Sequence, residues 1–374
     1  MKSLMGNIFE QIASVENIVA AIHSAAKGKR HKRAVRYAEA HAEEVAARLH
    51  DELTAGTWTP PAIHVGHEIN DGLKAKKRVI VCPEFVREQV VHHALISVIG
   101  PYIQRRSYRW SCGSMPGRGQ EEMAKYVSKA VTGKKLYVVP NLDVAKCFDS
   151  VDVDAIYAKF ARCIKCRRTL ALIRRILDGN AVKMPGGKIR RGGLPIGLFT
   201  SPWFMNFILG DVDNCFKDDF GVSVEMRFMD DIPLFDTNKR RLRRAIGAAT
   251  KVLARYGLKW KRPTQIHKFD HKVRICGFCV HPDGRVELRD RVYLNGRRLG
   301  ARLLKKRTGG RKLTAYDAQK MTSYSARFKA FGCYRAFVEE VLQGGKLTMS
   351  DMASIISRHD RAKAKARKSD VHEN

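Results

Sequence analysis

The stretch VSVEMRFMDDIPLFD, residues 222–236, places two adjacent aspartates between apolar segments. A short polar break inside an apolar run is typical of a β-hairpin, so we expect Asp230 and Asp231 at its turn. Adjacent carboxylates repel each other unless a cation lies between them. The pair therefore indicates either a solvated turn, which is the more common case, or a cation-binding site.

A third aspartate, Asp143, ends an apolar segment in NLDVAKCFDSV, residues 141–151. If this segment is a strand beside the hairpin, Asp143, Asp230 and Asp231 supply the oxygen ligands that Mg²⁺ prefers, with Mn²⁺ as the alternative ion. Two such ions ~4 Å apart stabilise the attacking 3′-oxygen and the leaving pyrophosphate of a nucleotidyl transfer. The three aspartates are therefore the predicted metal ligands and catalytic residues of such a transfer.

The charge of the chain points to the same class of partner. Seventy Lys and Arg face 37 Asp and Glu, which gives a formal net charge of +33. Such an excess favours a polyanion, and nucleic acid comes first because each neutralised phosphate releases condensed counterions. An anionic membrane is the alternative, but no apolar run approaches the ~20 residues that span a bilayer. We expect a nucleic-acid partner and no membrane partner.

Nine cysteines in a chain whose N-terminus lacks the pattern of a signal peptide predict free thiols and a cytoplasmic location. Two pairs have CxxC spacing, Cys163 with Cys166 and Cys276 with Cys279. Together they could form a four-thiolate zinc site. However, the first pair lies in a helical stretch, and the second lies in an alternating apolar run where positions three apart face opposite sides. We therefore favour structural cysteines.

Periodicity and turn signals predict alternating helices and short strands. Helices are expected over residues 8–55 with a basic break at 27–33, and over 83–103, 121–131, 152–178, 201–216 and 238–256; strands are expected over 76–82 and 135–144, with a hairpin at 273–288. The helix over 83–103 is predicted to end at Gly100-Pro101. The Gly-rich loop 107–120 is a candidate phosphate site through its backbone N–H groups and Arg118.

Taken in order, these motifs resemble those of bacterial and phage retroelement reverse transcriptases over residues 60–340. KKRVIVCPEFVREQVVHHAL resembles the fingers motif, which implies that Lys77 and Arg78 meet the incoming triphosphate. LDVAKCFDSV resembles the first catalytic motif and implies that Asp143 binds metal. Phe148 then falls where the family places a ring that excludes a ribose 2′-hydroxyl.

The remaining motifs extend the resemblance. GLPIGLFTSPWFMNFIL resembles the motif that backs the nascent base pair, which implies that Ile196 and Gly197 line the substrate site. FMDD stands in place of the family's YxDD box, with Phe228 replacing tyrosine. GLKWKR resembles a segment whose lysine lies by the pyrophosphate, here Lys259 or Lys261. CGFCVHPDG resembles the primer-grip hairpin.

Two positions depart from the general pattern. Most reverse transcriptases carry glutamine where this chain has Ile196, whereas enzymes of diversity-generating retroelements carry an aliphatic residue there. Pro202 departs from the diversifying pattern, IGxxxSQ, and agrees with the general one. An isoleucine cannot hydrogen-bond the base pair, which favours looser template reading or a specialised template. Equally, Ile196 is explained by packing alone.

The resemblance implies an α+β right-hand polymerase, with fingers, a palm built on an antiparallel sheet and a helical thumb. The expected domains are an N-terminal helical extension at residues 1–58, fingers and the start of the palm at 59–141, palm with interleaved fingers elements at 142–285, thumb at 286–345 and a basic C-terminal tail at 346–374. The last part of this tail, from residue 358, is predicted to be disordered or an RNA-contacting arm.

The function implied is that of an RNA-directed DNA polymerase, a nucleotidyltransferase that adds dNTPs to a primer on a dedicated structured RNA. Its partners would be that template RNA, the RNA/DNA hybrid and dNTPs, with an accessory protein or a second copy of the chain as further candidates. Antiphage defence and diversity generation are the two competing roles. The alternative of another class is a non-catalytic RNA-binding scaffold, which has no use for a repulsive cluster of aspartates.

Overall fold

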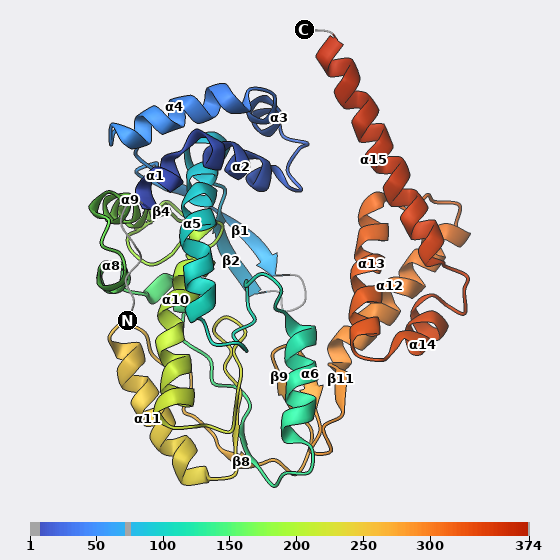
Figure 1. Cartoon of the computed structure of the whole chain (residues 1–374). Helices are drawn as coiled ribbons and strands as arrows, with labels where there is room; N and C mark the ends of the chain where they lie inside the picture. The colour runs from blue at the N-terminus through green and yellow to red at the C-terminus, as the bar shows by residue number, and fades with distance from the viewer. Residues whose placement is uncertain (1–7, 72–75, 373–374) are drawn as a thin grey trace. The chain divides into compact units, whose positions relative to one another are not determined.

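The computed structural model describes residues 8–71 and 76–372, and the chain packs as two compact units (Figure 1). The larger unit comprises Met1–Gly119 and Tyr137–His267, and the smaller unit comprises Gln120–Leu136 and Lys268–Asn374. The two units are defined by the packing of their residues and not by polymerase subdomains. The boundaries predicted for the fingers, palm and thumb therefore stay predictions. Among the described residues, no helix is both long and apolar enough to cross a membrane.

Helices make up most of the larger unit. They are α1 (Ile8–Ala13), α2 (Val15–Ala26), α3 (Arg33–Ala40), α4 (Ala42–Thr54), η1 (Phe85–Val90), α5 (Val91–Arg106), α7 (Cys147–Ser150), α8 (Val153–Cys163), α9 (Arg167–Asp178), α10 (Thr200–Asn214), η2 (Cys215–Asp219) and α11 (Lys239–Ala254). Each predicted N-terminal run forms two helices. The first divides at Ser14, whose hydroxyl accepts a hydrogen bond from the Asn17 N–H at 3.2 Å and so caps α2.

The end predicted for α5 at Gly100-Pro101 is wrong, because the helix continues to Arg106 with Pro101 inside it. Packing explains the difference. Ile99 and Ile103, on either side of the proline, are both fully buried. Gly100 lies so close to α10 that a Cβ there would be 3.3 Å from the Trp203 ring. Tertiary burial of one helix face therefore outweighs the lost hydrogen bond of the proline.

The larger unit contains two small sheets. In the first, β1 (His64–Asp71) pairs antiparallel with β2 (Lys76–Val81) and parallel with β4 (Val182–Lys183), which pairs antiparallel with β5 (Ile189–Arg190). In the second, β7 (Leu234–Asp236) lies between β6 (Val224–Glu225) and β3 (Tyr137–Val139), and both pairings are antiparallel. The predicted strand at 76–82 is confirmed as β2, and the helices with mostly antiparallel sheets confirm the α+β class.

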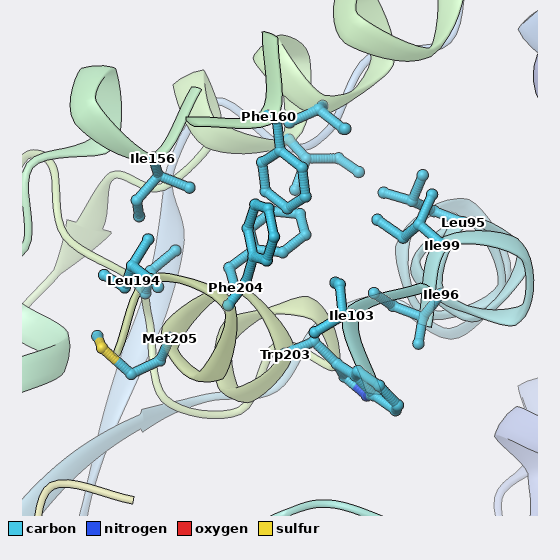
Figure 2. Close-up of a cluster of buried hydrophobic side chains, with 14 of the residues drawn as sticks. Leu95, Ile96, Ile99, Ile103, Ile156, Phe160, Leu194, Trp203, Phe204 and Met205 are labelled. Atoms are coloured by element: carbon cyan, nitrogen blue, oxygen red, sulfur yellow. The ribbon is translucent and has the colours of Figure 1, made fainter. Parts of the chain in front are cut away.

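A hydrophobic core joins α5, α8 and α10 to the loop before α10 (Figure 2). The side chains drawn and labelled there are Leu95, Ile96, Ile99, Ile103, Ile156, Phe160, Leu194, Trp203, Phe204 and Met205. Phe160 of α8 packs edge-on against Phe204 of α10, with ring centroids 4.9 Å apart. Leu194 is buried in the same cluster, so the loop that carries Ile196 is anchored to the core.

The smaller unit has a three-stranded sheet and a set of helices. Its elements are α6 (Gln120–Val131), β9 (Val273–Ile275), β10 (Phe278–Val280), β11 (Val286–Leu288), α12 (Asp290–Thr308), α13 (Ala315–Ala330), α14 (Tyr334–Ala336), η3 (Phe337–Val341) and α15 (Met349–His372), while β8 (His267–Lys268) lies at the boundary of the two units. The predicted hairpin at 273–288 is the antiparallel sheet with strand order β11-β10-β9.

One of the two alternatives predicted for the end of the C-terminal tail was disorder. This prediction is wrong for residues up to His372, because α15 continues to that residue. Alanine, lysine and arginine, which fill RAKAKARK, have high helix propensity. The start of α15 is also anchored, since Met352 is fully buried in the core of the smaller unit. The other alternative, an RNA-contacting arm, stays a prediction, and residues 373–374 lie outside the described residues.

Candidate active site

The predicted hairpin around FMDD is confirmed, with the two aspartates at its turn. The Phe228 N–H donates to the Asp231 carbonyl at 2.9 Å, and the Asp231 N–H donates to the Phe228 carbonyl at 3.2 Å. Met229 sits between them with a φ of 57°, in the left-handed region that a residue with a side chain seldom adopts. Asp230 is exposed at the turn and Asp231 is half-buried.

Asp143 lies directly beside this turn. The Ile232 N–H donates to the Leu142 carbonyl at 3.1 Å, and the Val144 N–H donates to the Asp230 carbonyl at 3.2 Å. These bonds place Asp143 opposite Asp231 in an antiparallel bridge. Residues opposite each other in such a pair have side chains on the same face, with Cβ atoms ~4.5–5.5 Å apart. The segments that carry the three predicted ligands are therefore neighbours.

The lysine segment runs along the other side of Asp143. The Lys261 N–H donates to the Asp143 carbonyl at 2.9 Å, and the Ala145 N–H donates to the Lys259 carbonyl at 2.8 Å. The Lys261 ammonium lies 3.3 Å from Asp143 Oδ2. Of the two lysines predicted for this site, Lys261 thus reaches a catalytic carboxylate, whereas Lys259 is exposed opposite Ala145.

The donor set fits a hard divalent cation, although the ligand cage is not assembled. In the described part of the chain, no three His, Cys, Asp or Glu side chains form a group that could hold a metal ion. Asp143, Asp230 and Asp231 offer only carboxylate oxygens, which suit Mg²⁺ or Mn²⁺. Because Lys261 is paired with Asp143, metal binding there requires the Asp143 carboxylate to exchange an ammonium for a cation of higher charge.

A buried arginine, Arg227, connects the FMDD turn to α10. Its guanidinium donates to both oxygens of Asp213, at 2.7 and 2.8 Å, and to the Asn206 side-chain oxygen at 2.7 Å. It also donates to the Met229 carbonyl at 3.3 Å. Burial alone would lower the pKa of Arg227, but the Asp213 carboxylate raises it, so the guanidinium stays charged. No motif in the sequence predicted a functional role for Arg227, Asp213 or Asn206.

The Gly-rich loop 107–119 packs on the same network. The Ser111 hydroxyl donates to Asp213 at 2.5 Å, and the Asn206 amide donates to the Gly113 carbonyl at 2.8 Å. Gly113 approaches the turn so closely that a Cβ there would lie 2.5 Å from the Met229 nitrogen. The available signal was the presence of Asn206 and Asp213 in a largely apolar helical stretch.

The structure does not support Arg118 as a phosphate ligand of this loop. Its guanidinium donates to the Tyr108 carbonyl at 2.8 Å and to the Gln104 carbonyl at 3.3 Å. Burial lowers the pKa of Arg118. Since these donors are directed at backbone oxygens within the larger unit, Arg118 holds the loop to the end of α5.

Phe148 is connected to the LPIG loop through the backbone. It is half-buried in α7, and its carbonyl accepts a hydrogen bond from the Leu194 N–H at 2.7 Å. Gly193 has a φ of 69°, and a Cβ there would lie 2.7 Å from the Phe148 carbonyl oxygen. Glycine at 193 therefore permits the close approach of the loop to the segment that carries Phe148.

The same loop is bonded to the end of β2. The Val81 N–H donates to the Ile196 carbonyl at 2.8 Å, and a Cβ on Gly197 would lie 2.1 Å from the Val81 carbonyl oxygen. Ile196 is half-buried and Gly197 is exposed. β2 also carries Lys77 and Arg78, which are both exposed.

The predicted triphosphate ligands are not all directed at the aspartates. Lys77 Nζ lies 2.8 Å from Glu68 Oε1 on the neighbouring strand, and both side chains are exposed. Such a surface pair is worth little and can be exchanged for a phosphate. The structure thus brings Asp143, Asp230, Asp231 and Lys261 together. Separate backbone hydrogen bonds link the loop of Ile196 to Phe148 and to the end of β2.

Comparison with known proteins finds a matching family and solved structures of similar fold. The family described as "Reverse transcriptase (RNA-dependent DNA polymerase)" matches residues 70–278. No curated protein matches the chain. A structure of apo telomerase from Candida tropicalis, truncated from its C-terminal domain, is similar with a TM-score of 0.47 and 14% identity, over 64% of this chain and 59% of that one.

Telomerase from Candida albicans, in complex with a TWJ fragment of telomeric RNA, is similar with a TM-score of 0.47 and 12% identity, over 82% of this chain and 55% of that one. This chain thus covers less than two thirds of the length of either telomerase chain. The family match spans more than half of this chain and agrees with the resemblance and the polymerase fold predicted from the motifs. The chain belongs to the reverse transcriptase family, the RNA-dependent DNA polymerases.

Proposed function

We propose that this chain is an RNA-directed DNA polymerase that adds dNTPs to a primer on a structured RNA, with Asp143, Asp230 and Asp231 as its catalytic carboxylates. The observation that carries the proposal is the antiparallel pairing of Asp143 with Asp231, which brings together residues from segments far apart in the sequence. Adjacent carboxylates repel each other, and a cation-dependent reaction explains why a fold would keep three of them side by side.

Mg²⁺ held by these carboxylates would stabilise the attacking 3′-oxygen and the leaving pyrophosphate, with Mn²⁺ as the alternative. The residues of the chain would position the substrates. Lys261, which lies 3.3 Å from Asp143, would exchange that carboxylate for a phosphate of the incoming nucleotide. Lys77 and Arg78 on β2 would bind the triphosphate from the fingers side.

The sugar and the base would be bounded by the residues of two loops. Phe148 would exclude a ribose 2′-hydroxyl by contact with its ring. Ile196 and Gly197 would lie against the nascent base pair, in a loop fixed to Val81 and to the buried Leu194. Lys259, exposed opposite Ala145, would lie by the pyrophosphate.

Primer extension tests this proposal. The purified chain is incubated with a DNA or RNA primer annealed to an RNA template, one labelled dNTP and Mg²⁺. We expect template-directed incorporation that stops when EDTA is added and resumes when Mg²⁺ is restored. RNA binding without incorporation on any RNA template, including the RNA that copurifies with the chain, would favour the non-catalytic scaffold instead.

For the biological role we propose a stand-alone bacterial or phage system such as antiphage defence, with diversity generation as the alternative. Ile196 favours a diversifying enzyme, whereas Pro202 departs from the diversifying pattern. Sequencing the copurifying RNA and the DNA made from it separates the two roles. DNA copies of a repeat that carry many substitutions would support diversification, and faithful copies of one dedicated RNA would support defence.

A further inference from the structure

The smaller unit contains a cavity of about 580 Å³ that none of the motifs predicted. This volume lies within the range of ~300–1,000 Å³ typical of sites for small molecules and cofactors. The loop between α12 and α13, the first residue of α13 and one face of α15 form its walls. The lining residues that matter here are Arg311, Lys312, Leu313, Ala315, Ile355 and Arg358.

Three of these residues give the cavity a net positive charge. Arg311, Lys312 and Arg358 are exposed, and each lacks a carboxylate partner among the residues that the structure describes. The acid in the wall, Asp351, is already paired with Arg307, whose guanidinium lies 2.7 Å from it. That guanidinium lowers the pKa of Asp351, so the acid neutralises Arg307 rather than the three cations.

The walls are held in place by contacts of their own. In the loop, the Arg311 N–H donates to the Lys306 carbonyl at 3.0 Å. Thr314 caps α13 in a capping box with Asp317, whose carboxylate lies 2.6 Å from the Lys306 ammonium. A ligand that enters therefore meets a preformed site and orders few groups on binding.

The remaining lining is apolar. Leu313, Ala315 and Ile355 are half-buried in the wall between the cations. A ligand that matches both the cationic and the apolar lining has an anionic group and a flat or apolar group close enough together to fit in this one cavity. A nucleotide has both, because its phosphate accepts charge-assisted hydrogen bonds from guanidinium groups and its base buries an apolar face.

We propose that this cavity binds one nucleotide unit of a single-stranded nucleic acid. Its phosphate would lie among Arg311, Lys312 and Arg358, and its base would lie against Leu313, Ala315 and Ile355. The proposal rests on the proposed function, which requires both an RNA template and a DNA product. It adds a second nucleic-acid site, formed entirely by residues of the smaller unit.

Fluorescence anisotropy with labelled single-stranded RNA and DNA 12-mers of the same sequence tests the proposal on the full chain. Arg358→Glu and the double variant Arg311→Glu/Lys312→Glu should weaken binding about tenfold or more, because charge-assisted hydrogen bonds to phosphate are lost. Lys320→Glu, an exposed cation on α13 outside the cavity, is the matched control and should change affinity less than about threefold. Equal effects of all three variants would overturn the proposal.

A further variant distinguishes entry of a nucleotide into the cavity from general electrostatic attraction between the chain and the nucleic acid. Ala315→Trp fills the cavity without changing charge, and should weaken binding at least about fivefold because the nucleotide can no longer enter. Circular dichroism checks that this variant is folded, and crosslinking of 4-thiouridine RNA to the wild-type cavity gives an independent measure if it is not. Unchanged affinity of a folded Ala315→Trp variant, or no crosslink to the lining residues, would contradict the proposal.

The two oligonucleotides identify the source of the nucleotide. Tighter cavity-dependent binding of RNA would assign the site to the template, and tighter binding of DNA would assign it to the product. Competition by poly-glutamate as strong as that by RNA would overturn the proposal in favour of an acidic protein. Primer extension by the same variants on a short preannealed hybrid reads out the proposed function separately, so either idea can fail alone.

Discussion

Arg227 shows how a single residue supports the catalytic turn without belonging to it. Its guanidinium connects Asp213 and Asn206 on α10 to the Met229 carbonyl, and the side chains of Arg227 and Asp213 are fully buried. A buried ion pair of this kind does not by itself indicate extra stability, but removing one partner leaves an unpaired buried charge. The strained backbone at Met229 is therefore held by a network that no motif identified.

Arg227→Lys is expected to impair both folding and catalysis. Lysine keeps the charge but cannot donate to Asp213, Asn206 and Met229 at once. We expect the free energy of unfolding to fall by about 2–4 kcal/mol and kcat to fall more than the affinity for RNA. Urea unfolding and steady-state primer extension measure these, with the exposed Arg240→Lys on α11 as the control. Wild-type kcat in the folded Arg227→Lys variant would show that the network has no positioning role.

Phe148 is the residue at which sugar discrimination is expected. Phe148→Ala should raise rNTP incorporation relative to dNTP by about tenfold or more, because a steric contact with the 2′-hydroxyl is removed. The ratio of kcat/KM values for the two nucleotides measures this. Phe220→Ala, a half-buried ring at the end of η2, is the matched control. A ratio that stays at the wild-type value while activity is retained would mean that Phe148 only packs.

At the scale of elements, local signals predicted some boundaries well and others poorly. The FMDD hairpin follows from an apolar–polar–apolar pattern, and the strand at 76–82 follows from its β-branched residues. The pattern could not predict β4 and β5, which are two residues long and owe their pairing to neighbouring strands. It also missed the passage of α5 through Pro101, which depends on packing against Trp203.

One contact between elements should make stability depend on pH. His64 of β1 lies 2.6 Å from Glu88 of η1, and both side chains are buried. Burial alone would lower the pKa of His64, but the hydrogen bond and charge of Glu88 raise it above its ordinary value of 6.5. Because the folded pKa is raised, the stabilisation is fully present below pH ~6.5 and is lost as pH rises through the folded pKa.

Urea unfolding of the wild type and of Glu88→Gln between about pH 5 and pH 9 measures this contribution. The wild type should exceed the variant most at the acid end, and the gap should narrow as pH rises. His92, whose pKa is lowered to about 3 by burial and by the nearby His64 and His93, stays neutral throughout this range. A gap that is constant with pH, or that widens on the alkaline side, would refute the assignment.

At the scale of the whole molecule, the family could be predicted from the sequence because its motifs are short, local and ordered along the chain. The pairing of Asp143 with Asp231 was implied by that order and is present. The buried hydrogen-bond network around Arg227 was not predicted. Its members, Ser111, Asn206, Asp213 and Arg227, come together only in the folded chain. The cavity in the smaller unit was missed for the same reason, since its loop and α15 are distant in sequence.

The net charge of +33 leads to a prediction about salt. If six to ten phosphate contacts form, affinity for RNA should fall ~10³–10⁵-fold between 50 and 200 mM salt, because released counterions drive binding. Anisotropy titrations across that range measure the slope. Repeating them with the Arg311→Glu/Lys312→Glu variant should reduce the slope by about one, because the cavity holds one phosphate. A nearly flat dependence would mean that the charge serves a protein partner.

The most direct test of the catalytic centre is Mg²⁺-dependent primer extension by Asp230→Ala and Asp231→Ala, with RNA affinity measured on the same preparations. Loss of the carboxylates should lower dNTP incorporation by about a thousandfold or more, since several kcal/mol of charge stabilisation is removed, while RNA binding stays within a few-fold of wild type. The control is Asp219→Ala, an exposed acid in η2. Incorporation within a few-fold of wild type by either variant would contradict the central claim.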